Sequence, residues 1–474
     1  MTPIPTLAGL AALAVAVGLQ GPKPKPVKSP FETMPVERDA TLVAKINEAI
    51  TRGESWLVKV QGKSGSFQSE ERGARIGYTE LALYALASGA LTLPGDEPQA
   101  TGSKPAVDKG AKPKKKEEPV EDHPHALRSA IERGLAFVKD NPFKETYALS
   151  LLLLTLDAHT TPKWERDRLA KLSTQDKLRY KFPRRLTDAD RLWIEQSTEQ
   201  LLTHRFKGIF SYSKNPGSGD ISNTQFALLG LRAAARCGAD VPPQVWADAL
   251  DYFVKYQDKA GPEGEFPVLR SEPVAGRPLE IVTVKAMERC WGYSFRDGGG
   301  FDPKKGKPPK PKDVPIAGFS AGASGTHASI GIASLQIARD ELARALDKKP
   351  DAALSSISVK MQPEVDRGIR DGIAWLAGHW TLEEDPGGGF PYYYLYSVER
   401  VGALLGDRFV GGHDWYREGA EILLRRQLKE GAWPSDTGEV NGVGSPDVVT
   451  TSFALLFLRR ATAAGVFTPD FTGK

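Results

Sequence analysis

The segment FPYYYLYSVER, which ends at Arg400, combines four tyrosine rings with a carboxylate and a guanidinium. On a helix, Tyr392, Tyr396 and Glu399 share one face. Tyr393 and Arg400 lie on the neighbouring face. Because a charge within an apolar helix is costly unless it is paired, Glu399 and Arg400 either form a structural ion pair across the fold or line a wet cavity. A wall of this kind suits a sugar ring or a polycyclic ligand.

Polar side chains also precede or begin six apolar segments. They are Tyr78, Thr79 and Glu80; Glu145, Thr146 and Tyr147; Asp220, Asn223, Thr224 and Gln225; Ser324, Thr326 and His327; Tyr392, Tyr393 and Tyr394; and Asp447, Thr450 and Thr451. Helix capping alone explains many of them. If the segments surround a cavity, the same residues line its mouth. The catalytic candidates are then Glu80, Asp220, His327, Glu399 and Asp447. The binding candidates are Tyr78, Asn223, Gln225, Tyr392, Tyr393, Tyr396 and Arg400.

Two further acidic clusters could do acid–base chemistry. Asp414 precedes an amphipathic segment and is typical of a helix N-cap, whereas its neighbour His413 offers the alternative of an acid/base pair. Asp436 and Asp447 flank the Gly-rich loop TGEVNGVGSPD. Hydrolysis of a glycan needs two carboxylates at a set separation, and the sequence selects no pair.

The elements that must position these groups are helices of two kinds. Six segments are apolar nearly all round, and such helices must be buried on most sides. They begin at Tyr78, Glu145, Asn223, Thr326, Tyr393 and Thr450. Six partner segments have apolar residues at i, i+3, i+4 and i+7 with charge opposite. They begin at Ile46, Leu127, Arg191, Pro243, Val365 and His413.

The pairing of these segments predicts a single all-α domain, an α/α toroid of about six helix pairs. The apolar helices form an inner ring and the amphipathic ones an outer ring, and closure hides the first unit against the last. An open solenoid is the competing arrangement, but it would expose one face of the inner helices.

A glycine, one residue and an aromatic recur between the two helices of a pair. The examples are Gly65–Phe67, Gly208–Phe210, Gly264–Phe266, Gly299–Phe301, Gly388–Phe390 and Gly431–Trp433. We expect the glycine to end the outer helix in a left-handed conformation. The aromatic then folds back over apolar surface. Asn141–Phe143 keeps the aromatic without the glycine.

An apolar run near the N-terminus and the Pro- and Lys-rich segments predict the limits of the domain and the cellular location of the protein. The apolar run Leu7–Leu19 has the length of a signal-peptide core and is short for a membrane span. We predict a signal peptide at 1–20, a spacer at 21–40 and export to the periplasm or the cell exterior. An uncleaved signal would make the one membrane contact. The toroid is expected at 41–468, with a disordered insertion at about 93–125 and a Pro/Lys loop at about 302–315. The segment 160–190 is expected to carry its own short helix.

The net charge of +4 implies no strong electrostatic partner. The Lys-rich segments lie in Pro-rich stretches, which are typical of solvated linkers and exclude a nucleic-acid footprint. Cys237 and Cys290 could pair or could be two buried small hydrophobes.

Gln427, Gly431 and Trp433 have the spacing Gln-x-x-x-Gly-x-Trp, which resembles the QW motif of squalene and hopene cyclases. The helix pairs from about Thr41 to Thr468 resemble the prenyltransferase and squalene oxidase repeat. This resemblance implies an α/α toroid. It implies little about activity, because terpenoid cyclases, prenyltransferase β subunits and complement-like thioester domains do different chemistry on this scaffold.

The catalytic motifs of those families are missing. Asp188-Ala-Asp190-Arg191 lacks the last carboxylate of the Asp-x-Asp-Asp motif, and it suits a helix N-cap. Asp-Cys-Thr-Ala-Glu and the thioester motif are absent. Zinc in prenyltransferases is held by Asp, Cys and His, whereas this chain offers Glu288, Cys290 and, after a long gap, His327. A buried cysteine and a histidine at the cavity edge are the other interpretation of Cys290 and His327. We expect no cofactor.

The sequence therefore predicts an exported, squalene-cyclase-like repeat protein that binds a ligand or serves as a scaffold. Its partner is a small lipid or sugar in the central cavity, or a protein. The alternative is an enzyme with a non-standard site in the cavity, a cyclase, isomerase, hydrolase or lyase that acts on a terpenoid or a glycan.

Overall fold

The computed structural model describes residues 40–67, 77–90, 123–162, 164–214, 219–269, 280–293, 323–440 and 443–461. The expected signal peptide, the spacer up to residue 39 and the Pro/Lys loop lie outside this part. So does most of the insertion expected at 93–125, although helix α4 begins inside that range, at His123.

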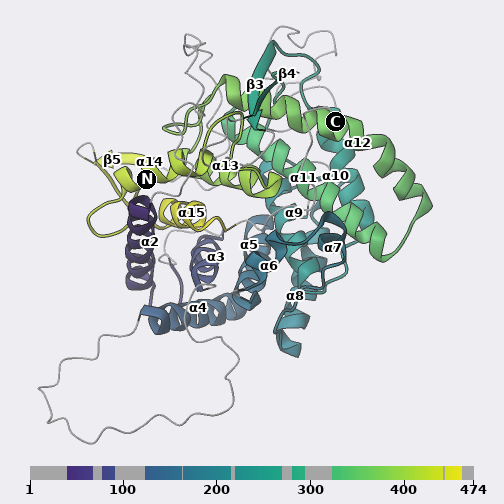
Figure 1. Ribbon diagram of the computed structural model, residues 1–474. Coiled ribbons are helices and arrows are strands. Elements are labelled where there is room, and N and C mark those ends of the chain that lie inside the picture. Colours follow the sequence, from purple (N-terminus) through teal and green to yellow (C-terminus); the bar gives the residue numbers. More distant parts are fainter. Residues whose placement is uncertain are drawn as a thin grey trace, which may run out of the picture.

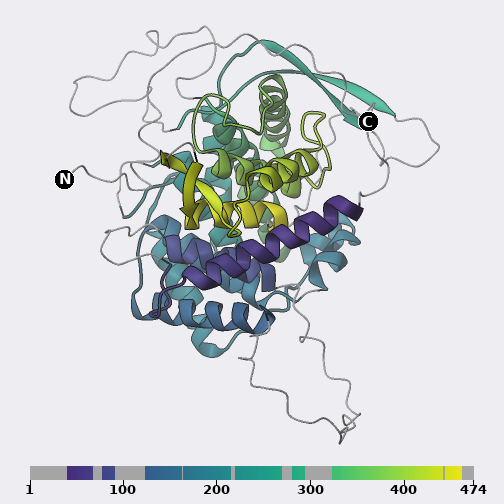
Figure 2. The ribbon, with the colours of Figure 1, turned by 90° about the vertical axis from the view of Figure 1, so that its left-hand side faces the viewer.

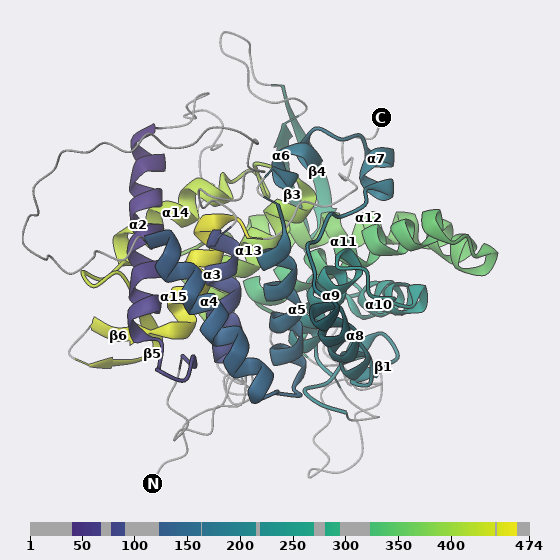
Figure 3. The ribbon, with the colours of Figure 1, turned by 90° about the horizontal axis from the view of Figure 1, so that it is seen from below.

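Six apolar helices form a closed ring, and this confirms the predicted α/α toroid. They are α3 (Tyr78–Ala90), α5 (Thr146–Thr160), α9 (Ile221–Arg236), α11 (Gly325–Lys348), α13 (Pro391–Leu405) and α15 (Val448–Arg459). Each packs against the next along the chain, and α15 packs against α3 (Figure 3). The ring leaves no open face on the inner helices, so the open solenoid is excluded.

The amphipathic helices form the outer layer (Figure 1). They are α2 (Ala40–Val60), α4 (His123–Asp140), α8 (Asp188–Leu202), α10 (Pro243–Tyr256), α12 (Ala352–Gly378) and α14 (Trp415–Arg426). In most units the outer helix packs on the inner helix of the preceding unit: α4 on α3, α8 on α5, α12 on α11 and α14 on α13. Helix α2 packs on α15 and α14 and so joins the first unit to the last (Figure 2).

The inner helices are buried because their side chains offer no polar face. In α5 every residue from Thr146 to Ala158 is buried. Its hydroxyls are satisfied within the helix, as when Ser150 donates to Thr146 O at 2.6 Å and Thr155 to Leu151 O at 2.8 Å. Burial of each large apolar side chain contributes about 1.5–3 kcal/mol. In the part of the chain that is described, no helix is long and apolar enough to cross a membrane.

Short antiparallel hairpins lie between helices of a pair and not in the middle of the ring. They are β1 (Arg205–Phe206) with β2 (Ile209–Phe210), β3 (Glu263–Leu269) with β4 (Ile281–Met287), and β5 (Trp433–Val440) with β6 (Val443–Asp447). Each follows an outer helix and precedes an inner one.

The predicted left-handed conformation is confirmed at three of the glycines, but the prediction that they end the outer helices is wrong, because α2, α12 and α14 already end at Val60, Gly378 and Arg426. Gly65, Gly388 and Gly431 have φ of 97°, 91° and 101°. The prediction is wrong at Gly208, where Lys207 takes the positive φ of 54°. It is also wrong at Gly264, which lies inside β3. Gly299 lies outside the described residues.

The QW motif ties the last unit to the first. The Gln427 amide donates to Gly431 O and to Ala49 O of α2, both at 2.8 Å. The Trp433 indole is fully buried and donates to Leu423 O at 2.8 Å. The aromatic therefore folds back over the end of α14, as predicted, and the motif serves ring closure.

An insertion after α5 covers the C-terminal ends of the inner helices. It carries two short helices, α6 (Glu165–Ala170) and α7 (Thr174–Arg179), where one was expected. Arg184, which follows them, bonds Asp157 of α5 and Glu165, both at 2.7 Å. Arg166 donates to Arg459 O at 3.2 Å, at the end of α15. This end of the ring is sealed by ion pairs.

Candidate functional site

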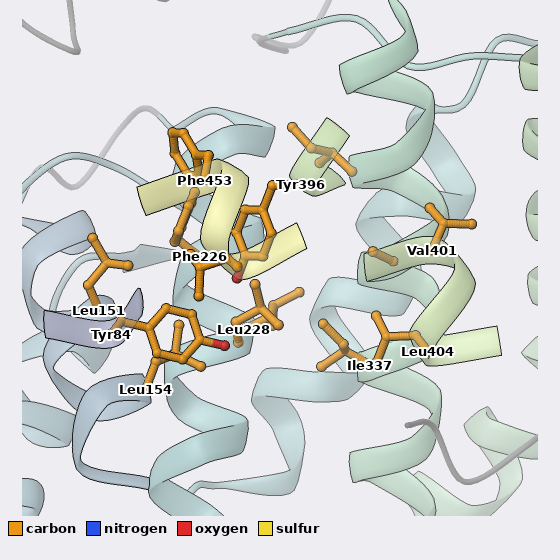
Figure 4. Packing of buried hydrophobic residues seen from close by; sticks show 14 of the residues in the cluster. Tyr84, Leu151, Leu154, Phe226, Leu228, Ile337, Tyr396, Val401, Leu404 and Phe453 are labelled. Carbon is orange, nitrogen blue, oxygen red and sulfur yellow. The ribbon is translucent and has the colours of Figure 1, made fainter. Parts of the chain in front are cut away.

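Aromatic rings from several inner helices meet towards the N-terminal end of the ring. Tyr147 lies 4.9 Å from Phe226, ring centroid to centroid, and Phe226 lies 6.1 Å from Tyr393. Phe453 lies 5.4 Å from Tyr393 and 5.5 Å from Tyr396. Figure 4 shows Phe226, Tyr396 and Phe453 together with Tyr84 of α3. We call this group the aromatic centre; it consists of Tyr84, Tyr147, Phe226, Tyr393, Tyr396 and Phe453.

A serine hydroxyl connects two of these rings, those of Tyr147 and Tyr393. Ser222 Oγ lies 3.2 Å from Tyr393 Oη and also hydrogen-bonds Tyr147 Oη. Beside them, Tyr212 Oη lies 3.1 Å from Tyr293 Oη. Burial raises the pKa of Tyr212 to about 12 and that of Tyr147 well above its usual value. The phenols therefore stay neutral and can both donate and accept hydrogen bonds.

Arg400 lies among these rings and is fully buried. Its Cζ is 4.2 Å from the Tyr396 ring centroid, 5.3 Å from that of Phe226 and 5.4 Å from that of Tyr393. Its Nη2 donates to Ser397 Oγ at 2.7 Å. Within the described ranges Arg400 forms no ion pair, and its Nε and Nη1 have no hydrogen-bond partner. Glu399 is fully buried as well. The two alternatives for this pair of residues, pairing across the ring or lining a wet cavity, stay predictions.

Glu80 is the most unusual carboxyl at this end. It is 1% exposed, and its Oε2 has no hydrogen-bond partner among the residues that the structure describes. Burial, and to a smaller extent the charge of Glu145, raises the pKa of Glu80 to about 8. It lies one helical turn before Tyr84 on the same face of α3. At neutral pH it is a protonated acid.

Two other acidic candidates cap inner helices. Asp220 accepts from the backbone and side-chain nitrogens of Asn223, both at 2.8 Å, and caps α9. Burial raises its pKa to about 6. Asp447 accepts from Val449 N at 2.8 Å and Thr450 N at 3.0 Å and caps α15. Its neighbour Asp436 has a pKa that burial raises to about 7, and the charge of Asp447 also raises it. Capping accounts for Asp220 and Asp447.

The remaining binding candidates are spread around the same end of the ring. The Gln225 amide is fully buried, and neither of its polar atoms has a partner within the described residues. Burial, followed by the charge of Asp447, raises the pKa of Tyr78. Tyr392 lies beneath Arg426, whose Cζ is 6.0 Å from its ring centroid. These three lie outside the aromatic centre.

Cys290 and His327 are not part of a recognisable metal site. The Cys290 thiol contacts the carbonyl oxygens of Trp291 and Ser324, each at 3.6 Å. The His327 ring lies 5.8 Å from that of Tyr293. The described residues contain no group of three or more His, Cys, Asp or Glu side chains that could hold a metal ion. Cys237 and Cys290 are both buried free thiols.

His413 has a carboxylate partner other than the one expected. Asp414 caps α14 and pairs with Arg408 at 3.0 Å. His413 Nδ1 instead lies 3.4 Å from Glu418 Oε1, and its ring stacks on Trp380 at 4.5 Å. This group lies on the outer layer, away from the aromatic centre.

Sequence reasoning missed three members of the aromatic centre and, outside it, a buried acid at the start of α11. Tyr84, Phe226 and Phe453 have the pattern of ordinary core residues. Asp385, which accepts from Thr326 N at 3.0 Å, is far from α11 in the chain. Burial raises its pKa to about 7. A periodic apolar pattern shows that a face is buried, but not that it points to the ring axis.

Comparison with known proteins adds a structural similarity. No family model matches the sequence, and no curated protein matches it. A solved structure, the apo form of the type II terpene cyclase MstE from Scytonema, is 12% identical and covers 88% of this chain and 98% of that one, with a TM-score of 0.29. Because that score is low, the assignment of the fold rests on the closed ring of helix contacts.

Proposed function

We propose that the toroid is a binding module that holds a small, ring-containing molecule at its aromatic centre. The observation that supports this most is the meeting of rings from α3, α5, α9, α13 and α15 at one end of the ring, where Ser222 links the hydroxyls of Tyr147 and Tyr393. A scaffold needs apolar packing at this place but no phenols.

The ligand that suits these groups has a flat or chair-like apolar face and a few hydroxyls. The aromatic faces pack against its carbon skeleton. The tyrosine and serine hydroxyls exchange hydrogen bonds with its polar edge. A cyclic lipid and a sugar both meet this description. The absent cyclase and prenyltransferase motifs favour binding without turnover.

Titration calorimetry on the full chain tests the proposal with two probes, a monoterpene alcohol and a methyl glucoside. We expect one of them to bind, and Tyr393→Ala to weaken that binding about tenfold or more, because the ring contacts Phe226, Phe453 and Arg400. Tyr180→Phe, at the other end of the molecule, is the control and should bind as the natural chain does. Native mass spectrometry of the purified protein should also show a co-purified small molecule.

If neither probe binds and no small molecule co-purifies, the binding proposal fails. A scaffold for a protein partner is then the better interpretation. It predicts that Tyr393→Ala changes stability alone.

The N-terminal run supports export as part of this proposal, because its length and small residues suit signal cleavage. Cell fractionation with N-terminal sequencing tests it. A cytosolic protein that keeps residue 1 would contradict it.

A second candidate function, acid catalysis, is favoured by Glu80. A buried carboxyl that stays protonated at neutral pH can donate a proton to a bound molecule, as general acids do. Glu80→Gln keeps the shape and removes the proton. If the protein converts a terpenoid or glycan probe, this variant should lose about 100-fold or more of the rate. An unchanged rate would remove Glu80 from the reaction.

A further inference from the structure

We propose that Arg400 binds an anion within the aromatic centre, so that the molecule held there carries a carboxylate or a comparable monovalent anionic group. This inference rests on the binding function proposed above and adds the charge of the ligand.

The burial of Arg400 is the first step. Its side chain is fully buried, and in the described part of the chain it forms no ion pair. A buried charge is costly unless something compensates it. The carboxylate of Asp220, which like Arg400 acts electrostatically on Tyr393, is bonded to Asn223 at the start of α9. The fold thus brings a positive charge to its centre without a protein anion bonded to it.

The second step is the direction of the free donors. Rings of Phe226, Tyr393 and Tyr396 lie within 5.4 Å of the guanidinium carbon, and such cation–π contacts stabilise the charge. An aromatic ring is a poor acceptor for the N–H groups at the guanidinium edge. Nη2 donates to Ser397 Oγ, and the Tyr393 and Tyr396 hydroxyls lie close by. Nε and Nη1 form no hydrogen bond of ordinary geometry among the described residues. These edges can receive an anion.

A neighbouring hydroxyl adds a further donor. Tyr396 is fully buried, its ring lies against the guanidinium, and its Oη, which lies beside the Tyr84 hydroxyl and Arg400, forms no hydrogen bond of ordinary geometry in the described ranges. Figure 4 shows this hydroxyl directed into the interior, toward that of Tyr84. A carboxylate there would accept charge-assisted hydrogen bonds from Arg400 and a hydroxyl bond from Tyr396, while the rest of the ligand packs on the rings.

The experiment compares sodium benzoate with benzyl alcohol, which has the same ring and no charge, by titration calorimetry of the full chain in one buffer. We expect benzoate to bind about tenfold or more tightly than benzyl alcohol. Arg400→Met should abolish this preference, and Arg400→Lys should keep part of it. Tyr396→Phe should weaken benzoate several-fold.

The matched control is Tyr394→Phe. Tyr394 is equally buried and its hydroxyl also has no partner among the described residues, but its ring lies against Gly325, at the start of α11. This variant should bind benzoate like the natural chain. If Arg400→Met does not fold, Arg400→Lys and Tyr396→Phe decide the matter, because both keep the site filled.

Equal binding of the two probes overturns the anion site and leaves the binding function intact. A benzoate preference that none of the Arg400 and Tyr396 variants changes also overturns it. If neither ring compound binds but sodium formate binds and depends on Arg400, the anion site stands and the proposed function fails. If formate and both ring compounds all fail to bind, both proposals fall.

Discussion

The two ends of the inner ring differ in whether their buried acidic side chains form ion pairs. At the C-terminal end, Asp157 and Glu165 are buried and each bonds Arg184. At the N-terminal end, burial raises the pKa of Glu80 to about 8 and that of Asp385 to about 7, and neither forms an ion pair in the described part of the chain. One end uses charge for closure, and the other keeps polar groups without charged partners. The second arrangement is typical of sites.

The largest expected effect comes from removing Arg184 from the ion network at the C-terminal end of the ring. Arg184→Ala leaves Asp157 and Glu165 buried without their shared partner, although Arg236 still lies 3.4 Å from Asp157. Removing one member of a buried ion network costs about 3–5 kcal/mol, and we expect the upper part of that range because two carboxylates are affected. Urea unfolding followed by circular dichroism measures the loss.

Arg179→Ala is the control for this variant. Arg179 is 69% exposed and pairs with Asp347 at 3.3 Å. Exposed pairs contribute little, so its unfolding curve should nearly overlay that of the natural chain. Equal losses for the two variants would show that the buried network does not seal this end.

The next effect is a pH dependence of stability that comes from Glu80, at the N-terminal end of the ring. Its pKa is higher in the folded chain, about 8, than in the unfolded chain. The folded state therefore holds more protons between pH 4.5 and 8, and its stability falls as pH rises through that window. Glu80→Gln should remove this loss and be more stable above pH 8, by on the order of 4 kcal/mol.

Asp220, Asp385 and Asp436 also lower the stability of the folded chain as pH rises, because burial raises the pKa of each. The difference between the natural chain and Glu80→Gln isolates Glu80 from them. Glu132→Gln, at an exposed position of α4, controls for loss of a carboxyl. Parallel stability curves for the natural chain and Glu80→Gln from pH 4 to 9 would refute the assigned protonation.

A smaller effect is expected from alanine substitution at two glycines that have nearly the same positive φ and lie at opposite ends of the ring. Gly431, in the QW turn, has φ of 101°, and Gly238, after α9, has φ of 98°. A Cβ at Gly431 would lie 2.4 Å from Arg52 O of α2, whereas one at Gly238 would meet nothing within 4 Å. Gly431→Ala should cost about 3 kcal/mol and Gly238→Ala about 1 kcal/mol, because both are strained but only one is also crowded.

Thermal unfolding of both glycine variants makes this comparison. Since Gly431 lies where the last unit meets the first, a small loss there would mean that ring closure does not depend on the QW turn.

The sequence predicts the toroid well because its strongest signal is simple. Helices α9 and α15 are apolar nearly all round, and no arrangement hides such helices as well as a closed ring does. The turn geometry is predicted less well. Lys207 takes the left-handed conformation beside Gly208, since the β1–β2 hairpin fixes which residue must turn.

The candidate site is predicted only in part. Tyr393, Tyr396 and Arg400 stand out because they interrupt an apolar helix, and Glu80 because it begins one. Phe226 gives no such signal, since its role depends on which buried face points inward. The network around Arg184 is also hidden, because the charged insertion that carries it has no periodic pattern to place it over the ring.

The smallest expected effect concerns the hydrogen bond that fixes the turn before α15, at the N-terminal end of the ring. Thr451 is fully buried and its Oγ1 accepts from Trp433 N at 3.0 Å. Thr451→Val leaves this N–H buried without an acceptor and should cost about 1–2 kcal/mol in urea unfolding, whereas Thr451→Ser should recover most of it. Thr155→Val, deeper in α5, removes a hydroxyl that only donates, to Leu151 O at 2.8 Å and more weakly to Glu80 O at 3.4 Å. The Leu151 carbonyl keeps its helical partner, so Thr155→Val should cost less than Thr451→Val. A larger loss of stability for Thr155→Val than for Thr451→Val would mean that the bond from Trp433 N to Thr451 does not hold the Trp433 turn in place.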